Sequence, residues 1–352
     1  MRLRHPSGRI VHLSCEVAPR PDSNLPGIVA QLDTYGQVRG RLGADLLGVN
    51  LWLPPALAAA LAVESRARTR LRAELDARRL EVVTLSGALF SSGEGGGDDP
   101  SAQVSPAQAS PAQVSPAQVS PAGMTSAGMS PAGMSPAGMS PAGMSPAWTE
   151  PARREYTLDL ARILLDLLDE DAVRGAISTI GLGPRAGWAE ASDKASAGIL
   201  RRLSAGLADL AWQNGRAVRV GFEPAPGLVL DGPEQTATAM SRTDRERLGV
   251  CLDLGHVART WTDPAAGIAS LTEAGLSVIE VRLAAVPGGT TEAWRSALRQ
   301  VFGAGGPLTE YLTLLSRVPD PSPEQVAGDV AYLLAELAAL GLTPENEPCP
   351  AR

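Results

Sequence analysis

The chain has 352 residues, a length that suits two average domains or one α/β barrel. Lys and Arg total 31 against 38 Asp and Glu, and without a basic run this net charge of −7 argues against nucleic acid and anionic membranes as partners. No segment approaches the roughly 20 apolar residues of a membrane span, and no signal-peptide run follows the basic start, so we expect a cytoplasmic protein.

Eight short apolar segments alternate with helical patterns along the chain. Runs such as LGVNLWL, LEVVTL, VRVGFE and LGVCLDL are apolar at most positions, which is typical of parallel strands covered on both faces. The clearest helix is predicted to begin after Ser322, an N-cap, with Pro323 in its first turn. We predict strands at residues 10–15, 47–53, 80–85, 176–182, 218–223, 248–254, 278–283 and 311–315.

The number and order of these elements predict the fold. Eight strand–helix alternations favour a closed α/β barrel of the (β/α)8 TIM type over an open doubly wound sheet. No GxGxxG phosphate turn follows the first strand, which also argues against the open sheet. We assign residues 1–90 and 148–342 to the barrel and residues 343–352 to a flexible tail.

A five-residue repeat interrupts the barrel after its third predicted strand. Units of SPAQV and then SPAGM recur from about Ser101 to Ala147, without charged or aromatic side chains. Proline removes backbone donors, and Ala, Ser and Gly bury too little apolar area to offset the cost of ordering the chain. Residues 91–147 are therefore predicted to be a disordered insert, on the face where barrel enzymes keep their active sites.

Polar side chains at the carboxyl ends of two neighbouring predicted strands form the candidate site. Glu223 ends one strand, Asp253 ends the next, and His256 follows three residues later. Two carboxylates and a neutral imidazole are suitable ligands for a divalent Mn, Zn or Fe ion. Such an ion would polarise a sugar carbonyl and hydroxyl, as an isomerase or epimerase requires. The plainer alternative is that Asp253 accepts bonds from loop amides and that His256 caps the following helix.

Two further residues are candidates for contact with a small-molecule substrate. Arg282 follows the seventh strand's apolar run, and at the barrel mouth it would hold a phosphate or carboxylate bidentately. Alternatively, it would pair with Glu223 or Asp253 and replace a metal's charge. Asn50 lies on the second predicted strand, two residues before Trp52, and we expect its side chain to point into the mouth. The sequence identifies no residue as the catalytic base.

These segments resemble a known protein family. GFEPAPG, GVCLDLGHVA, TLSGALF, WTEPARREYTLDLARIL and the opening RHPSGRIVHLS are similar to segments of the metabolite traffic protein EboE family, which belongs to the xylose isomerase-like barrel superfamily. That superfamily includes sugar phosphate isomerases and epimerases. The resemblance implies a divalent metal on Glu223, Asp253 and His256. It also implies partners among the products of the same operon and a role in handling a small polar metabolite.

The chain departs from the family pattern at several ligand positions. Ala225 stands where the family has a second acid, Arg282 where it has Gln or His, and Thr313 and Leu315 where it has a further acid. A guanidinium cannot ligate a metal and repels one. Two functions therefore stay open: a metal-dependent sugar or sugar phosphate isomerase or epimerase, or a catalytically degenerate barrel that acts as a binding or scaffolding protein.

Overall fold

Eight parallel strands close into a barrel, as the sequence predicts. The computed structural model describes residues 1–17, 24–87, 146–285, 291–316, 318 and 320–345. Each barrel strand pairs in parallel with the next along the chain, and the last pairs with the first through His12 and Tyr311. The strands are β2 (Ile10–Glu16), β3 (Leu47–Trp52), β4 (Leu80–Ser86), β5 (Arg174–Ile180), β6 (Ala217–Glu223), β7 (Leu248–Asp253), β8 (Val278–Leu283) and β9 (Tyr311–Leu314).

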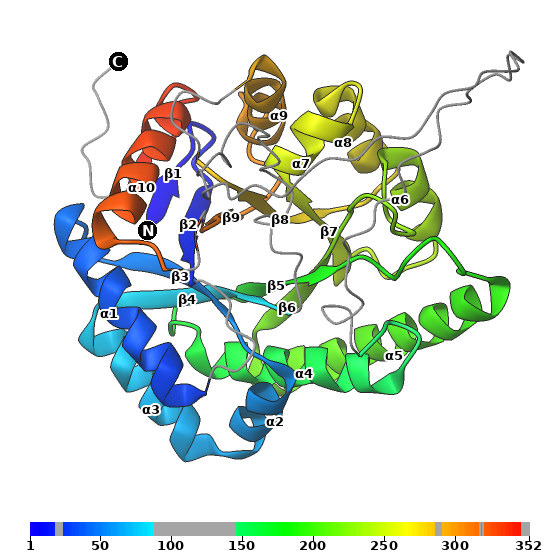
Figure 1. Ribbon diagram of the computed structural model, residues 1–352, viewed down its shortest axis with the longest axis horizontal. Coiled ribbons are helices and arrows are strands. Elements are labelled where there is room, and N and C mark those ends of the chain that lie inside the picture. Colours follow the sequence, from blue (N-terminus) through cyan, green and yellow to red (C-terminus); the bar gives the residue numbers. More distant parts are fainter. Residues whose placement is uncertain (18–23, 88–145, 286–290, 317, 319, 346–352) are drawn as a thin grey trace, which may run out of the picture. The chain divides into compact units, whose positions relative to one another are not determined.

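Helices cover the outside of the strand ring (Figure 1). Because each strand is covered by helices outside and by side chains inside, β4, β7 and β8 are buried at every position. The helices are α1 (Leu25–Arg41), α2 (Pro55–Val63), α3 (Ser65–Ala77), α4 (Pro151–Leu167), α5 (Glu190–Asn214), α6 (Pro233–Ala239), α7 (Leu254–Thr260), α8 (Pro264–Glu273), α9 (Glu292–Phe302) and α10 (Pro323–Ala338). In the described part of the chain, none of them is both long and apolar enough to cross a membrane.

The last helix begins where the sequence predicts. The Ser322 side chain accepts a hydrogen bond from the Gln325 backbone amide at 3.2 Å, and the Gln325 side chain accepts one from the Ser322 amide at 2.9 Å. This reciprocal pair is a capping box, and it satisfies two amides that the helix itself leaves unpaired. It fixes the residue at which α10 begins.

Two short strands extend the sheet beyond the prediction. β1 (Arg2–Arg4) pairs antiparallel with β2, and β10 (Thr343–Pro344) pairs antiparallel with β1. Leu3 of β1 is fully buried. β10 lies at the beginning of the segment that the sequence assigns to the tail, and residues 346–352 lie outside the described residues.

The chain divides into a barrel unit, Met1–Phe90 with Gly143–Arg352, and a second unit, Ser91–Ala142. The second unit, and with it most of the predicted insert, lies outside the described residues. Where the chain returns to the barrel, the Trp148 indole donates to the Ile180 carbonyl oxygen at 3.2 Å and packs 4.9 Å from the Phe222 ring. This buried tryptophan anchors the returning chain against β5 and β6.

Candidate functional site

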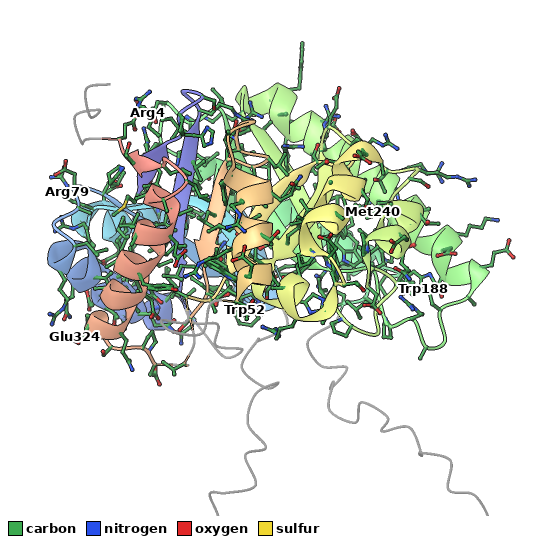
Figure 2. All side chains as sticks on the ribbon, turned by 90° about the horizontal axis from the view of Figure 1, so that it is seen from above. Arg4, Trp52, Arg79, Trp188, Met240 and Glu324 are labelled. Atoms are coloured by element: carbon green, nitrogen blue, oxygen red, sulfur yellow. The ribbon has the colours of Figure 1, made fainter. Side chains whose placement is uncertain are left out.

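The carboxyl ends of the strands meet at one end of the barrel. In Figure 2, Trp52 at the end of β3 and Glu324 at the beginning of α10 lie toward this end, whereas Arg4 lies toward the opposite end. The end at which strands finish is where barrel enzymes carry their chemistry, because the loops there vary without disturbing the packed layers below. We call this end the barrel mouth.

Three charged side chains from β2, β6 and β8 come together at the mouth. The Arg282 guanidinium donates from Nη1 to Glu223 Oε2 at 2.8 Å and from Nη2 to Glu16 Oε1 at 2.5 Å. Arg282 is 1% exposed, Glu223 4% and Glu16 7%, so solvent screens none of the three. We call Glu16, Arg282 and Glu223 the ion triad.

The backbone holds the triad at one level of the barrel. Arg282 lies in register with Asp253 of β7 on one side and Thr313 of β9 on the other. The Ser316 amide donates to Glu16 Oε2 at 3.2 Å, and the Tyr35 hydroxyl donates to the Glu16 carbonyl oxygen. Hydrogen bonds to its side chain and to its backbone thus fix the position of Glu16, and its carboxylate is held in place for the Arg282 guanidinium.

Burial sets the charge of the triad. Burial raises the pKa of Glu223 to about 7, although the Arg282 charge opposes the shift, and burial raises the pKa of Glu16 in the same way. Burial lowers the pKa of Arg282, but Glu223 and Glu16 together raise it above its ordinary value. Arg282 is therefore a permanent cation, while Glu223 exchanges its proton near neutral pH.

A polar cluster from β3, β4 and β5 lies inside the barrel, with Asn50 in register with Glu16 of the triad. The fully buried Asn50 amide donates to Thr84 Oγ1 at 2.8 Å, and its carbonyl oxygen accepts from Ser86 Oγ at 2.6 Å. Ser86 Oγ lies 3.1 Å from Ser178 Oγ. Asn50, a predicted substrate contact, thus has both of its amide groups engaged by β4 side chains, and a ligand would have to compete with them.

Glu280 is a second buried acid of the barrel interior. It is fully buried, and its Oε1 accepts from the Thr313 hydroxyl at 2.6 Å. Burial raises the pKa of Glu280 to about 7, and the charge of Arg282 and the hydroxyls of Thr313 and Ser178 only partly oppose this. The interior therefore holds more carboxyl groups than cations, and protonation near neutral pH reduces the excess negative charge.

The three predicted metal ligands lie in different local settings. Glu223 is bonded to Arg282, as the alternative interpretation of Arg282 expects. Asp253 caps α7: its Oδ1 accepts from the Gly255 amide at 2.8 Å and from the His256 amide at 3.2 Å. His256 lies within α7, with Nε2 at 3.2 Å from the Thr260 hydroxyl, and burial lowers its pKa. Among the described residues, no three His, Cys, Asp or Glu side chains are grouped to hold a metal ion.

As arranged, the residues at the mouth do not fit a divalent ion. The Glu223 carboxylate faces a guanidinium, and a second cation brought to the same oxygens would be repelled at close range. Asp253 directs one oxygen to backbone amides, which leaves it less available as a ligand. The carboxylates at the mouth therefore pair with Arg282 in place of a metal ion, and we derive no metal-dependent step from them.

Sequence reasoning missed Glu16. It follows the predicted first strand directly, so its place at a strand end was visible in the sequence. Its partner Arg282 is 266 residues away. Only the closure of the barrel between β2 and β9 brings the two side chains together, and no local pattern encodes that pairing.

Comparison with known proteins identifies the fold. No family model matches the chain, and no curated protein matches it. A D-tagatose 3-epimerase-like protein superposes with a TM-score of 0.55 at 12% identity, over 94% of this chain and 98% of that chain. D-psicose 3-epimerase from Clostridium cellulolyticum H10, solved with D-tagatose, gives 0.53 at 10% identity over 94% and 99%.

A xylose isomerase domain protein from Planctomyces limnophilus gives a TM-score of 0.50 at 12% identity, over 94% of this chain and 97% of that chain. At such identities the likeness shows the fold alone, which is a (β/α)8 barrel. The resemblance to the EboE family rests on the sequence segments alone.

Proposed function

We propose that this protein is a catalytically degenerate xylose isomerase-like barrel that binds or scaffolds a small polar metabolite without a divalent metal. The observation that carries the proposal is the ion triad, in which Arg282 occupies the space between Glu16 and Glu223. Its fixed positive charge takes the part that a metal ion would play in holding buried carboxylates together. The sequence resemblance to the EboE family supports a role in metabolite handling beside products of the same operon.

The polar character of the ligand follows from the lining of the barrel. Asn50, Thr84, Ser86 and Ser178 place hydroxyl and amide groups in the interior, where apolar side chains would fill a purely structural barrel. Hydroxyl-rich molecules exchange hydrogen bonds with such groups at little desolvation cost. The proposed ligand is therefore a polyol or a small hydroxy acid rather than an apolar molecule.

A second candidate is a metal-dependent sugar or sugar phosphate isomerase or epimerase, with Mn, Zn or Fe on Glu223, Asp253 and His256. Two observations favour it. Asp253 and Glu223 end neighbouring strands and are close enough for the Asp253 charge to raise the pKa of Glu223. The fold is shared with a D-tagatose 3-epimerase-like protein and with a D-psicose 3-epimerase. This function requires Arg282 to leave Glu223.

Elemental analysis separates the two candidates. The purified protein is stripped with a chelator, reconstituted with Mn²⁺, Zn²⁺ or Fe²⁺, and compared with Glu223→Gln and Asp253→Asn. Glu273→Gln, on the exposed end of α8, is the matched control. We expect no bound metal above that of the control. Near-stoichiometric metal that both site variants lose would overturn the proposal in favour of the isomerase.

Ligand binding is tested on the metal-free protein. A panel of sugars, polyols and hydroxy acids is screened by thermal unfolding, since a ligand that binds only the folded state raises the midpoint. We expect at least one of them to stabilise the metal-free wild type and to leave Asn50→Ala unaffected. Stabilisation that appears only after metal is added would contradict the proposal.

A further inference from the structure

A cavity of about 470 Å³ opens at the end of the barrel opposite the mouth. Its walls come from the beginnings of β5 and β6, the residues that precede β7 and β8, and the face of α5 that carries Leu207 and Ala211. Four arginines line it, namely Arg174, Arg219, Arg245 and Arg247. None of them contributes to the ion triad, so the cavity is independent of the function proposed above.

Two of the four arginines have carboxylate partners. Arg174 pairs with Glu310 at 3.4 Å, and Arg247 pairs with Asp244 at 2.9 Å and with Glu246 at 3.6 Å. Within the described residues, no carboxylate pairs with Arg219 or Arg245. Arg219 donates from Nε to the Glu246 carbonyl oxygen at 2.9 Å, which holds the side chain without neutralising it. The cavity therefore carries an excess of positive charge, with four arginines against the carboxylates of Glu310, Asp244 and Glu246.

Arg219 is electrostatically strained in this position. Burial lowers its pKa, and the neighbouring charge of Arg174 lowers it further, although Glu310 and Tyr311 partly oppose the shift. An anion in the cavity would add a favourable charge beside this cation. The carbonyl oxygens of Leu168 and Asp169, which follow α4, already accept hydrogen bonds from Arg216. The arginines that line the cavity are therefore not needed to satisfy the end of this helix.

We propose that this cavity binds the phosphate group of a small molecule through Arg219 and Arg245. A guanidinium presents its N–H donors in a planar fork that matches the oxygens of a phosphate. A phosphate monoester carries nearly two negative charges at pH 7, so each of these two guanidinium groups would face one of them. The Ser277 hydroxyl, which also lines the cavity, donates to the Arg245 carbonyl oxygen at 3.3 Å and so contacts the backbone that carries this arginine.

Calorimetric titration tests the site with two probes, inorganic phosphate and glucose 6-phosphate, at an ionic strength held constant with sodium chloride. The variants are Arg219→Gln and Arg245→Gln, each of which removes one charge while keeping a polar side chain. Arg242→Gln is the matched control, since Arg242 is exposed in the same connection but does not line the cavity. Arg245 is itself exposed, so its substitution leaves the fold intact even if Arg219→Gln does not fold.

Both probes are expected to bind the wild type and Arg242→Gln, and the dissociation constant should rise about tenfold in Arg219→Gln and Arg245→Gln. Tighter binding of glucose 6-phosphate than of inorganic phosphate identifies a phosphorylated metabolite as the ligand; equal binding identifies the phosphate group alone. The proposal is wrong if neither probe binds above the chloride background. It is also wrong if Arg245→Gln binds both probes as tightly as Arg242→Gln does. In that case the cavity's arginines serve only to balance the carboxylates at this end of the barrel.

Discussion

At the scale of single residues, Arg282 is the counter-ion of two buried carboxylates. Arg282→Leu leaves Glu16 and Glu223 buried without their counter-ion, and breaking a buried pair in this way costs about 3–5 kcal/mol. We expect a loss of that size in the free energy of unfolding, measured by urea denaturation at pH 7. A loss below about 1 kcal/mol would mean that the two carboxyl groups take up protons or reach solvent once Arg282 is gone, so that charge pairing does not hold the triad together.

The same substitution has an internal control. In the triple variant Arg282→Leu, Glu16→Gln, Glu223→Gln none of the triad's three charges stays buried, so most of the lost stability should return. The recovery measures the coupling between the three side chains, because each single change alone leaves a partner unsatisfied. If the losses of unfolding free energy in the three single variants add up to the loss in the triple variant, the three side chains do not act as one interaction.

Glu280 makes the stability of the barrel depend on pH. Its pKa is raised from 4.5 in the unfolded chain to about 7 in the fold, so between these values the unfolded state has released a proton that the folded state keeps. Stability therefore falls as pH rises from 4.5 to 7, by roughly 3 kcal/mol for this group.

Glu280→Gln removes this titration while keeping a neutral partner for Thr313. Urea denaturation across pH 4.5–7 should show a shallower decline in the variant than in the wild type, whereas the exposed control Glu273→Gln should follow the wild type. Equal slopes in the wild type and Glu280→Gln would show that Glu280 is ionised throughout.

At the scale of elements, Asp253 is the residue that begins α7. Its side chain satisfies two amides of the first turn, so Asp253→Ala should lower the free energy of unfolding by about 1 kcal/mol, whereas Asp253→Asn, which keeps the acceptor oxygen, should change it by less than about 0.5 kcal/mol. Asp263 caps α8 in the same way, by accepting from the Ala266 amide at 3.0 Å, and Asp263→Ala is the matched control. A much larger loss at Asp253 than at Asp263 would assign the carboxylate a role beyond capping.

The barrel strands were predictable from the sequence, but the contacts across the barrel were not. Apolar runs such as LGVCLDL mark β7 to within one residue, because a parallel strand covered on both faces needs apolar side chains at nearly every position. β1 escaped prediction because three residues, RLR, carry no periodicity and pair only through tertiary contact. Glu223 and Asp253 were placed at strand ends correctly. Their partners, Arg282 and the amides of α7, depend on register and closure, which local patterns do not encode.

At the scale of the whole molecule, the barrel unit and the repeat segment are expected to be energetically separate. The repeat lacks the apolar area for a core, and the barrel unit, Met1–Phe90 with Gly143–Arg352, contains all of the described strands and helices. Deletion of residues 91–142 shortens the connection between β4 and α4 about fivefold. Because each halving of a loop saves about 0.6 kcal/mol of closure entropy, the deletion should raise the free energy of unfolding by up to roughly 1.5 kcal/mol.

Urea denaturation of the deletion variant and the full chain measures this difference, and the slope of the free energy against urea concentration should stay nearly the same, since it reports the surface exposed on unfolding. A scrambled insert of equal length and composition is the control, and it should leave stability unchanged if the repeat acts only as a connection. A deletion that lowers the free energy of unfolding by more than about 1 kcal/mol, together with a smaller slope, would show that the repeat packs on the barrel. In that case the barrel could not be treated as complete without it.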